Sequence, residues 1–226
     1  MEPEVLFFDT ETTGLEFFKK GNASVRRYDP TIHGKEFAPN PAILTMQFCV
    51  RPGEAYMLVW DHPENPIPQR RKPKLVQQLI QLLSNPNTLV IGQNSTFDSR
   101  FMRACTGVKY EIGGDTLMLA ALVDENAMSK GQDTLVKQYV PDMAGYADRF
   151  NSQYDKSRMW EVPLDELLMY GCGDVDTGLR LYDVLIRIVE KDDLLTAQYQ
   201  YVSMPGINTF VDVEMEGIYI DHDALS

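Results

Sequence analysis

The sequence predicts an α/β domain built on a mixed five-stranded sheet that is flanked by helices. Apolar strand-like runs dominate the first part of the chain, a short link joins two of them, and strand and helix patterns alternate afterwards. At 226 residues, with 44% hydrophobic residues, the chain is long enough for one domain with a sizeable core and a short appendage.

Most of the expected strands lie in the first half of the chain. They fall at about residues 4–9, 42–50, 55–60, 88–92 and, more weakly, 110–112. The Arg51-Pro52-Gly53-Glu54 link is short enough to make the second and third strands a hairpin or meander. A helical pattern ends at Asn85-Pro86, and from Asp115 onward the pattern is mostly helical.

Two carboxylates stand two residues apart where the first strand ends, in Phe8-Asp9-Thr10-Glu11-Thr12. Side chains at i and i+2 of a strand point the same way, so Asp9 and Glu11 project together. Two like charges this close raise each other's pKa unless a cation lies between them, and carboxylate oxygens suit Mg²⁺ or Mn²⁺. A strand that runs into a turn with solvated acids is the alternative.

A third acid follows the fourth expected strand. Gly92-Gln93-Asn94 reads as a turn, and Asp98 falls in the first turn of the helix after it. A helix-capping box, Ser95-x-x-Asp98, explains this aspartate equally well, because an acid near a helix N-terminus is favoured without any metal.

A fourth acid lies on a long helical stretch from about Pro163 to Val189. Tyr170 and Asp174 are four residues apart and share one helix face. Gly171 and Gly173, beside them, each cost roughly 1 kcal/mol against alanine. Such glycines indicate the close approach of another backbone or a ligand, or else tight helix packing.

Taken in order, these motifs resemble the 3′–5′ exonuclease family named for its four acids, Asp-Glu-Asp-Asp, in the subgroup that carries tyrosine. Asp-x-Glu is Asp9 and Glu11, Asn-x3-Asp ends at Asp98, and Tyr-x3-Asp is Tyr170 and Asp174. The resemblance implies the ribonuclease H-like form of the mixed five-stranded sheet.

The resemblance also implies a site for two divalent ions, Mg²⁺ or Mn²⁺. Asp9 would bridge both ions, Glu11 and Asp174 would complete the site that activates water, and Asp98 would hold the second ion through water. Tyr170 would orient the attacking water, because a phenol with a pKa near 10 is a poor general base at neutral pH.

Four further residues are expected to bind the terminal nucleotide by the same resemblance: Thr10, Leu15, Gln93 and Asn94, with Leu15 as a wedge against the terminal base. Two loops are rich in basic residues. The insertion at about 16–40 reads as a solvated loop that could also touch DNA or a partner. The segment 141–162 has interleaved aromatics that could guide a single strand, or it is a packed surface loop.

The last residues add a narrower resemblance. Met204-Pro205-Gly206-Ile207 and the stretch up to Asp221 look like the junction between the proofreading and polymerase domains of family A DNA polymerases. We therefore expect an exonuclease domain over residues 1–203 and the start of a polymerase-junction segment over 204–226. A polymerase domain would be a partner, either in cis or as a separate chain, and the sequence leaves both open.

The function that these resemblances imply is hydrolysis of DNA from single-stranded or frayed 3′ ends, releasing nucleoside 5′-monophosphates, in the proofreading part or subunit of a polymerase. One alternative is an RNA 3′-end trimming enzyme similar to ribonuclease D. Another is a catalytically silent scaffold for a polymerase, against which the intact acids argue.

Charge and composition limit the other functions. A formal net charge of −12 argues against broad adhesion to nucleic acid, so any DNA contact should be local. No apolar run approaches the ~18 residues of a membrane span, and the N-terminus lacks a secretory pattern. The three cysteines are widely spaced and predict neither disulfides nor a zinc site. We expect a cytoplasmic protein without a membrane partner.

Overall fold

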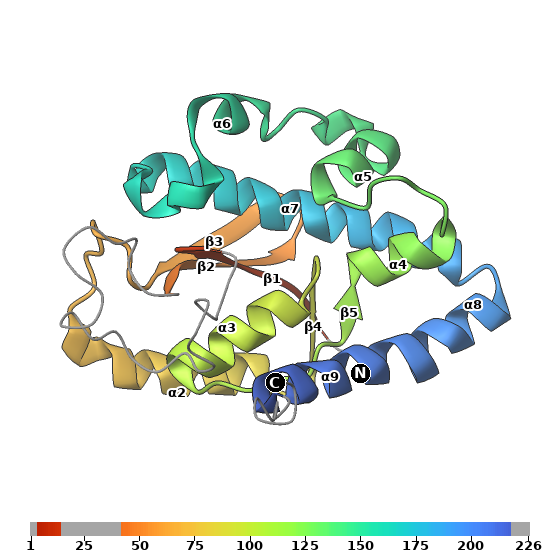
Figure 1. Cartoon of the computed structure of the whole chain (residues 1–226), viewed down its shortest axis with the longest axis horizontal. Coiled ribbons are helices and arrows are strands. Elements are labelled where there is room, and N and C mark those ends of the chain that lie inside the picture. Colours follow the sequence, from red (N-terminus) through yellow and green to blue (C-terminus); the bar gives the residue numbers. More distant parts are fainter. Residues whose placement is uncertain (1–3, 15–41, 218–226) are drawn as a thin grey trace, which may run out of the picture.

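The fold is a five-stranded mixed sheet with helices packed against it, and the predicted fold class is confirmed (Figure 1). A computed structural model describes residues 4–14 and 42–217. The strand order is β3-β2-β1-β4-β5. β1 pairs antiparallel with β2 and parallel with β4, β3 is antiparallel to β2, and β5 is parallel to β4.

The strands are β1 (Glu4–Thr12), β2 (Ile43–Arg51), β3 (Glu54–Val59), β4 (Thr88–Gly92) and β5 (Gly114–Asp115). The α-helices are α2 (Lys72–Leu83), α3 (Thr96–Thr106), α4 (Thr116–Val123), α5 (Gln132–Tyr139), α6 (Asp148–Gln153), α7 (Leu164–Val189), α8 (Asp193–Gln198) and α9 (Met204–Glu216). Short turns of other helix types lie between them, among them η3 (Lys156–Glu161) and the π-helical η4 (Tyr199–Ser203).

β1 is the central strand of the sheet. Its residues Leu6, Phe7 and Phe8 are almost fully buried, because strands flank it on both edges and helices cover both faces (Figure 1). α7 crosses one face, and α2, α3 and α9 lie on the other side of the sheet. A strand buried in this way reads as a continuous apolar run, which is why the sequence identified it.

α7 can lie close to the sheet because it carries glycines where it crosses the strands. A Cβ atom at Gly178 would lie 2.2 Å from Cζ of Phe7 on β1. A Cβ atom at Gly171 would lie 2.6 Å from Nε2 of the buried Gln47 on β2. The glycines of the long helix therefore accommodate side chains of the sheet, and α7 carries Tyr170 and Asp174 on the turns beside them.

The expected strand near residues 110–112 is wrong, and β5 lies a few residues later. Tyr110 and Ile112 are buried, but the backbone of Ile112 is bonded to the Asn208 side chain of α9 and not to a strand. The ladder instead begins where Gly113 donates to the Val90 carbonyl and Gly114 pairs with Ile91. Gly114 thus supplies half of the two-residue strand β5.

The link between β2 and β3 forms the predicted antiparallel hairpin. Gly53 in this link has a φ of +83°, a conformation that glycine adopts without steric cost. Its backbone N–H donates to Asp176 of α7, which fixes the hairpin end to the helix. The basic insertion at about 16–40 and Leu15 lie outside the described residues.

α9 packs against the same body as the preceding helices. Ile207 and Val211 point into the main core, and Arg103 of α3 forms an ion pair with Asp212. Arg100 pairs with Glu214 at 2.8 Å. The predicted boundary at residue 203 stays a prediction. Among the described helices, none is long and apolar enough to cross a bilayer.

Replacing Gly178 by alanine is expected to destabilise the protein by about 1–3 kcal/mol, because the added methyl group overlaps Phe7 in a packed core. The matched control is Gly206→Ala in α9, where nothing lies within 4 Å of the new Cβ, so that change should be neutral or stabilising. Urea unfolding of both variants measures the difference. Equal midpoints for the two variants would contradict this packing account.

Candidate active site

Three carboxylates meet at the carboxyl end of β1. Asp9 and Glu11 project from the strand, and Asp174 reaches them from α7. Their ligand oxygens all lie within 4.8 Å of one another, and each residue is partly buried. The structure therefore brings together the first and third sequence motifs, which lie far apart along the chain.

Asp98 lies beside this cluster and is held by β1 itself. Its Oδ1 accepts a hydrogen bond of 2.9 Å from the Thr10 backbone N–H and one of 2.6 Å from the Thr10 hydroxyl. The backbone N–H of Ser95, which a capping box would give to Asp98, donates instead to Asp115. The capping-box alternative is therefore wrong, and the Asp98 side chain faces the strand that carries Asp9.

Burial raises the pKa of all four acids, and neighbouring carboxylates add to this at Asp9 and Glu11. Burial raises the pKa of Asp9 well above its usual range, and the charges of Asp98, Glu11 and Asp174 raise it further. Burial and Asp174 also raise the pKa of Glu11. Burial brings the pKa of Asp98 to about 7, although the hydrogen bonds from Thr10 lower it. Ionising all four acids is therefore costly without a bound cation.

Asp174 is held by two phenols. Burial raises its pKa to about 6, against the lowering effect of hydrogen bonds from Tyr146 and Tyr170. Gln132 of α5 donates to the Asp174 backbone carbonyl at 2.7 Å and contacts the Tyr146 hydroxyl at 3.3 Å. Tyr146 and Gln132 were missed by the sequence analysis, because neither belongs to a motif and each lies far from Asp174 in sequence.

Tyr170 lies between an aromatic ring and a cation. Phe150 stacks on it with ring centroids 3.9 Å apart. Lys156 donates to the Tyr170 hydroxyl at 2.7 Å and lies 4.8 Å from the centre of its ring. Burial, with the charges of Asp174 and Glu11, raises the pKa of Tyr170 above its usual range, so the phenol stays protonated at neutral pH.

A hollow of about 380 Å³ opens beside the acids and is the room available to a ligand. Asp9, Asp174, Tyr170, Tyr146 and Lys156 line it. Among the described residues that line this hollow, Lys156 is the one with a positively charged side chain.

Of the predicted nucleotide-binding residues, the structure describes Thr10, Gln93 and Asn94. Gln93 lines this hollow, with its amide bonded to the Lys130 carbonyl and to Thr116. Asn94 is exposed next to it and has a φ of 56°, a left-handed conformation that asparagine tolerates. Thr10 gives its N–H and hydroxyl to Asp98. Leu15 lies outside the described residues.

The basic segment at 141–162 is mostly engaged in structure. Arg149 forms an ion pair with Glu166, and Arg158 forms one with Glu161. Trp160 packs against the smaller of the two apolar clusters. Lys156 differs from these residues, because it faces the acids.

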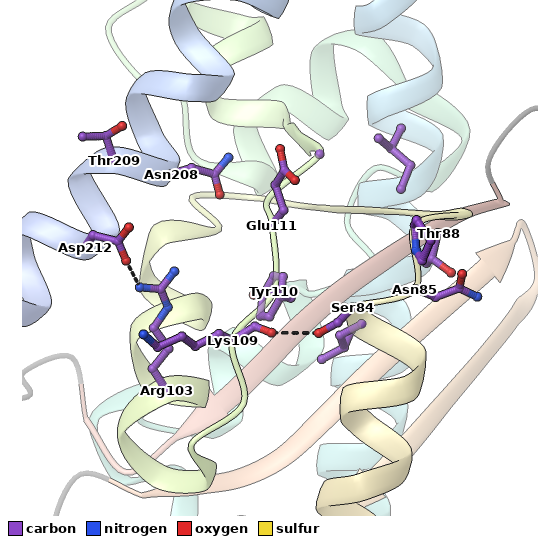
Figure 2. A pocket seen from close by; sticks show the side chains of 14 residues that line it. Ser84, Asn85, Thr88, Arg103, Lys109, Tyr110, Glu111, Asn208, Thr209 and Asp212 are labelled. Atoms are coloured by element: carbon purple, nitrogen blue, oxygen red, sulfur yellow. Dashed lines mark hydrogen bonds and ion pairs between the residues drawn. The ribbon is translucent and has the colours of Figure 1, made fainter.

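A second hollow, of about 750 Å³, lies at the opposite end of β4, where Thr88 and Leu89 begin the strand (Figure 2). The Arg103–Asp212 ion pair and the bond from Ser84 to the Lys109 carbonyl form parts of its wall. It shares no lining residue with the hollow at the acids and contains none of the predicted site residues.

The donor set fits divalent cations of the magnesium type. All donors are carboxylate oxygens, which such ions prefer over nitrogen or sulfur. Burial and the neighbouring acids raise the pKa of Asp9 and Glu11, and a bound cation would offset the charge of the converging carboxylates.

Three features occur together in this site: Asp-x-Glu on the central strand of a ribonuclease H-like sheet, an aspartate on the helix after β4, and Tyr-x3-Asp on a long helix. Together they define a 3′–5′ exonuclease of the four-acid class with tyrosine. The family model described as 3′–5′ exonuclease, from A-type DNA polymerases, matches residues 32–190. The chain belongs to this 3′–5′ exonuclease family. The matched range holds Asp98, Tyr170 and Asp174, whereas Asp9 and Glu11 precede it.

Curated relatives are DNA polymerases. The DNA polymerase of Bacillus phage SP01 is 25% identical over 199 residues, which is 86% of this chain and 22% of the relative. The DNA polymerase of Escherichia phage T5 is 26% identical over 167 residues, 66% of this chain and 19% of the relative. The chain thus spans about a fifth of the length of the curated relatives it matches.

Solved structures share the fold. NrnC of Brucella melitensis aligns with a TM-score of 0.66 and 19% identity over 95% of this chain and 86% of that chain. A structure of Trypanosoma brucei RNase D in complex with GMP aligns with a TM-score of 0.59 and 17% identity over 98% and 61%.

The metal-free protein is expected to lose stability as the pH rises from about 4 to 7. An acid whose pKa is raised in the folded state stabilises the fold fully below its unfolded pKa, about 3.9 for aspartate, and this stabilisation disappears as the pH passes its folded pKa, about 7 for Asp98. Asp98→Asn should flatten this fall and melt at a higher temperature at pH 8.

Thermal unfolding in the presence of a chelator measures the effect across this pH range. Asp142→Asn, which removes the same charge from an exposed position, is the control and should leave the pH dependence unchanged. Parallel pH curves for the wild type and Asp98→Asn would show that Asp98 is not an uncompensated buried acid.

Proposed function

We propose that this chain hydrolyses DNA from single-stranded or frayed 3′ ends and releases nucleoside 5′-monophosphates. The observation that carries the proposal is the convergence of Asp9, Glu11 and Asp174 within 4.8 Å, with Asp98 held alongside, in a chain of the 3′–5′ exonuclease family. Two Mg²⁺ or Mn²⁺ ions are the proposed cofactors. Such a pair supplies an activated water and neutralises charge on the phosphate and the leaving oxygen.

Each acid has a proposed position in this site. Asp9, at the centre of the cluster, would contact both ions, and Glu11 and Asp174 would hold the ion on the side of the attacking water. Asp98 is fixed by Thr10 next to Asp9 and would hold the other ion through water. All four are therefore proposed metal ligands, direct or through water.

Tyr170 is proposed to orient the attacking water. Its phenol is protonated because burial and neighbouring acids raise its pKa, which argues against a role as general base. The stacked Phe150 and the hydrogen bond to Asp174 fix its ring and hydroxyl. A hydroxyl fixed in this way supports positioning, which lowers the barrier by holding the water in line.

The terminal nucleotide is proposed to occupy the hollow beside the acids. Its volume of about 380 Å³ falls within the range of small-ligand sites, about 300–1,000 Å³. Gln93 lines it, and Thr10 and Asn94 follow the lining residues Asp9 and Gln93 in sequence, so these three, with Leu15, are the proposed nucleotide contacts. None of these contacts distinguishes one base from another.

We further propose that the chain is the proofreading part or subunit of a family A DNA polymerase, with residues 1–203 as the exonuclease domain and 204–226 as the start of the junction. The polymerase relatives support this role, since the chain matches about a fifth of their length. Removal of mispaired ends would then follow from melting, because unstacking a terminal base costs a few kcal/mol and costs least at a mismatch.

A second candidate is hydrolysis of RNA or of very short oligonucleotides. The structural neighbours favour it, because NrnC of Brucella melitensis, in structures with bound Mg²⁺ and bound to pGG, aligns over 97% of this chain and 91% of that chain.

Comparing 3′ ends separates the two candidates. With Mg²⁺ at one salt concentration, we expect single-stranded DNA to be digested fastest, mismatched duplex ends next and matched ends slowest, because the net charge of −12 gives no surplus of cations to hold a duplex. RNA of the same sequence and dinucleotides should be poorer substrates. Faster digestion of RNA or dinucleotides would favour the second candidate, and equal rates on all DNA ends would contradict proofreading by melting.

Asp9→Ala is expected to remove nearly all activity while the fold stays intact or becomes slightly more stable, because one like charge leaves the cluster. Single-turnover hydrolysis and thermal unfolding of the same preparation measure both effects. Asp165→Ala, an exposed acid in the first turn of α7, is the control and should keep full activity. Wild-type turnover by pure Asp9→Ala protein would exclude the metal site.

A further inference from the structure

Lys156 differs from the other described basic residues of its segment in what it contacts. Arg149 and Arg158 have carboxylate partners, whereas the Lys156 ammonium group donates to a neutral phenol. It is also the one Lys or Arg among the described residues that line the hollow at the acids. Its positive charge lowers the pKa of both Glu11 and Asp174, which shows that it lies within electrostatic reach of the cluster.

The position of this ammonium group relative to a substrate follows from Tyr170. Lys156 Nζ lies 2.7 Å from the hydroxyl that is proposed to hold the attacking water. Reacting atoms in a productive complex lie about 3–3.5 Å apart. The phosphorus atom would therefore lie one such contact beyond the attacking water. A lysine has a flexible four-carbon stem and three rotatable donors, so its ammonium group can cover this distance without moving the backbone.

We propose that Lys156 binds the phosphate next to the 3′ terminal nucleotide: its ammonium group is bonded to the Tyr170 hydroxyl in the empty site and moves to a phosphate oxygen when a strand enters. This inference rests on the proposed function and adds a substrate contact to it. The transfer leaves the Tyr170 hydroxyl free to bind water at the moment when the phosphate arrives. It also places the positive charge of Lys156 at the site where this acidic chain would bind a negatively charged DNA strand.

The measurement is equilibrium binding of a short single-stranded DNA in the Asp9→Ala background at constant Mg²⁺, between about 50 and 200 mM NaCl. Lys156→Met should weaken binding about tenfold, as expected for one charge-assisted hydrogen bond. It should also make the slope of log affinity against log salt shallower by about 0.7, the value for one phosphate contact on a single strand. Lys156→Arg should restore most of both.

The matched control is Arg158→Met, two residues along the same η3 turn, whose side chain pairs with Glu161 and does not line the hollow. It should leave the salt slope unchanged. With Asp9 intact, Lys156→Met should raise KM.

The outcomes separate this proposal from the function on which it rests. A salt slope that Lys156→Met leaves unaltered, or complete absence of DNA binding by the Asp9→Ala protein, would overturn the role of Lys156. A purely structural or charge-balancing lysine would change metal affinity or melting temperature and leave the slope as it was. Failure of the intact chain to hydrolyse any 3′ end would instead refute the proposed function, since the binding slope is measured without hydrolysis.

Discussion

Mutual repulsion among four carboxylates at the end of one buried strand is the constraint on which the rest of the structure depends. Burial and neighbouring acids raise the pKa of Asp9 and of Glu11, so the folded state is under electrostatic strain without a cation. The central strand β1, with sheet neighbours on both edges, holds Asp9 and Glu11 in place against this repulsion.

The same constraint explains the unusual features of α7 and of Asp98. Asp174 can join Asp9 only if the long helix lies close to the sheet, and Gly171 and Gly178 make that approach possible where side chains of β2 and β1 fill the space. Asp98 is brought to the strand by two donors of Thr10, the residue between the two acids of β1. Packing and hydrogen bonding thus hold together four carboxylates that would otherwise repel one another.

The features that the sequence could predict are local ones. The apolar run of β1, the two-residue spacing of Asp9 and Glu11 and the four-residue spacing of Tyr170 and Asp174 each fall within one element, so periodicity reveals them. The contacts of Tyr146 and Gln132 with Asp174 join separate elements, and no spacing encodes them.

The misplaced fifth strand has the same cause. Burial of Tyr110 and Ile112 produced an apolar pattern typical of a strand, but the hydrogen bonds of Ile112 go to Asn208 of α9. Buried backbone N–H and C=O groups need hydrogen-bond partners. Because those of Ile112 bond to a side chain 96 residues away, the strand ladder begins after this residue. Glycines at 113 and 114 then allowed it to begin beside Leu89 and Ile91. Local patterns therefore report burial more faithfully than they report hydrogen-bond partners.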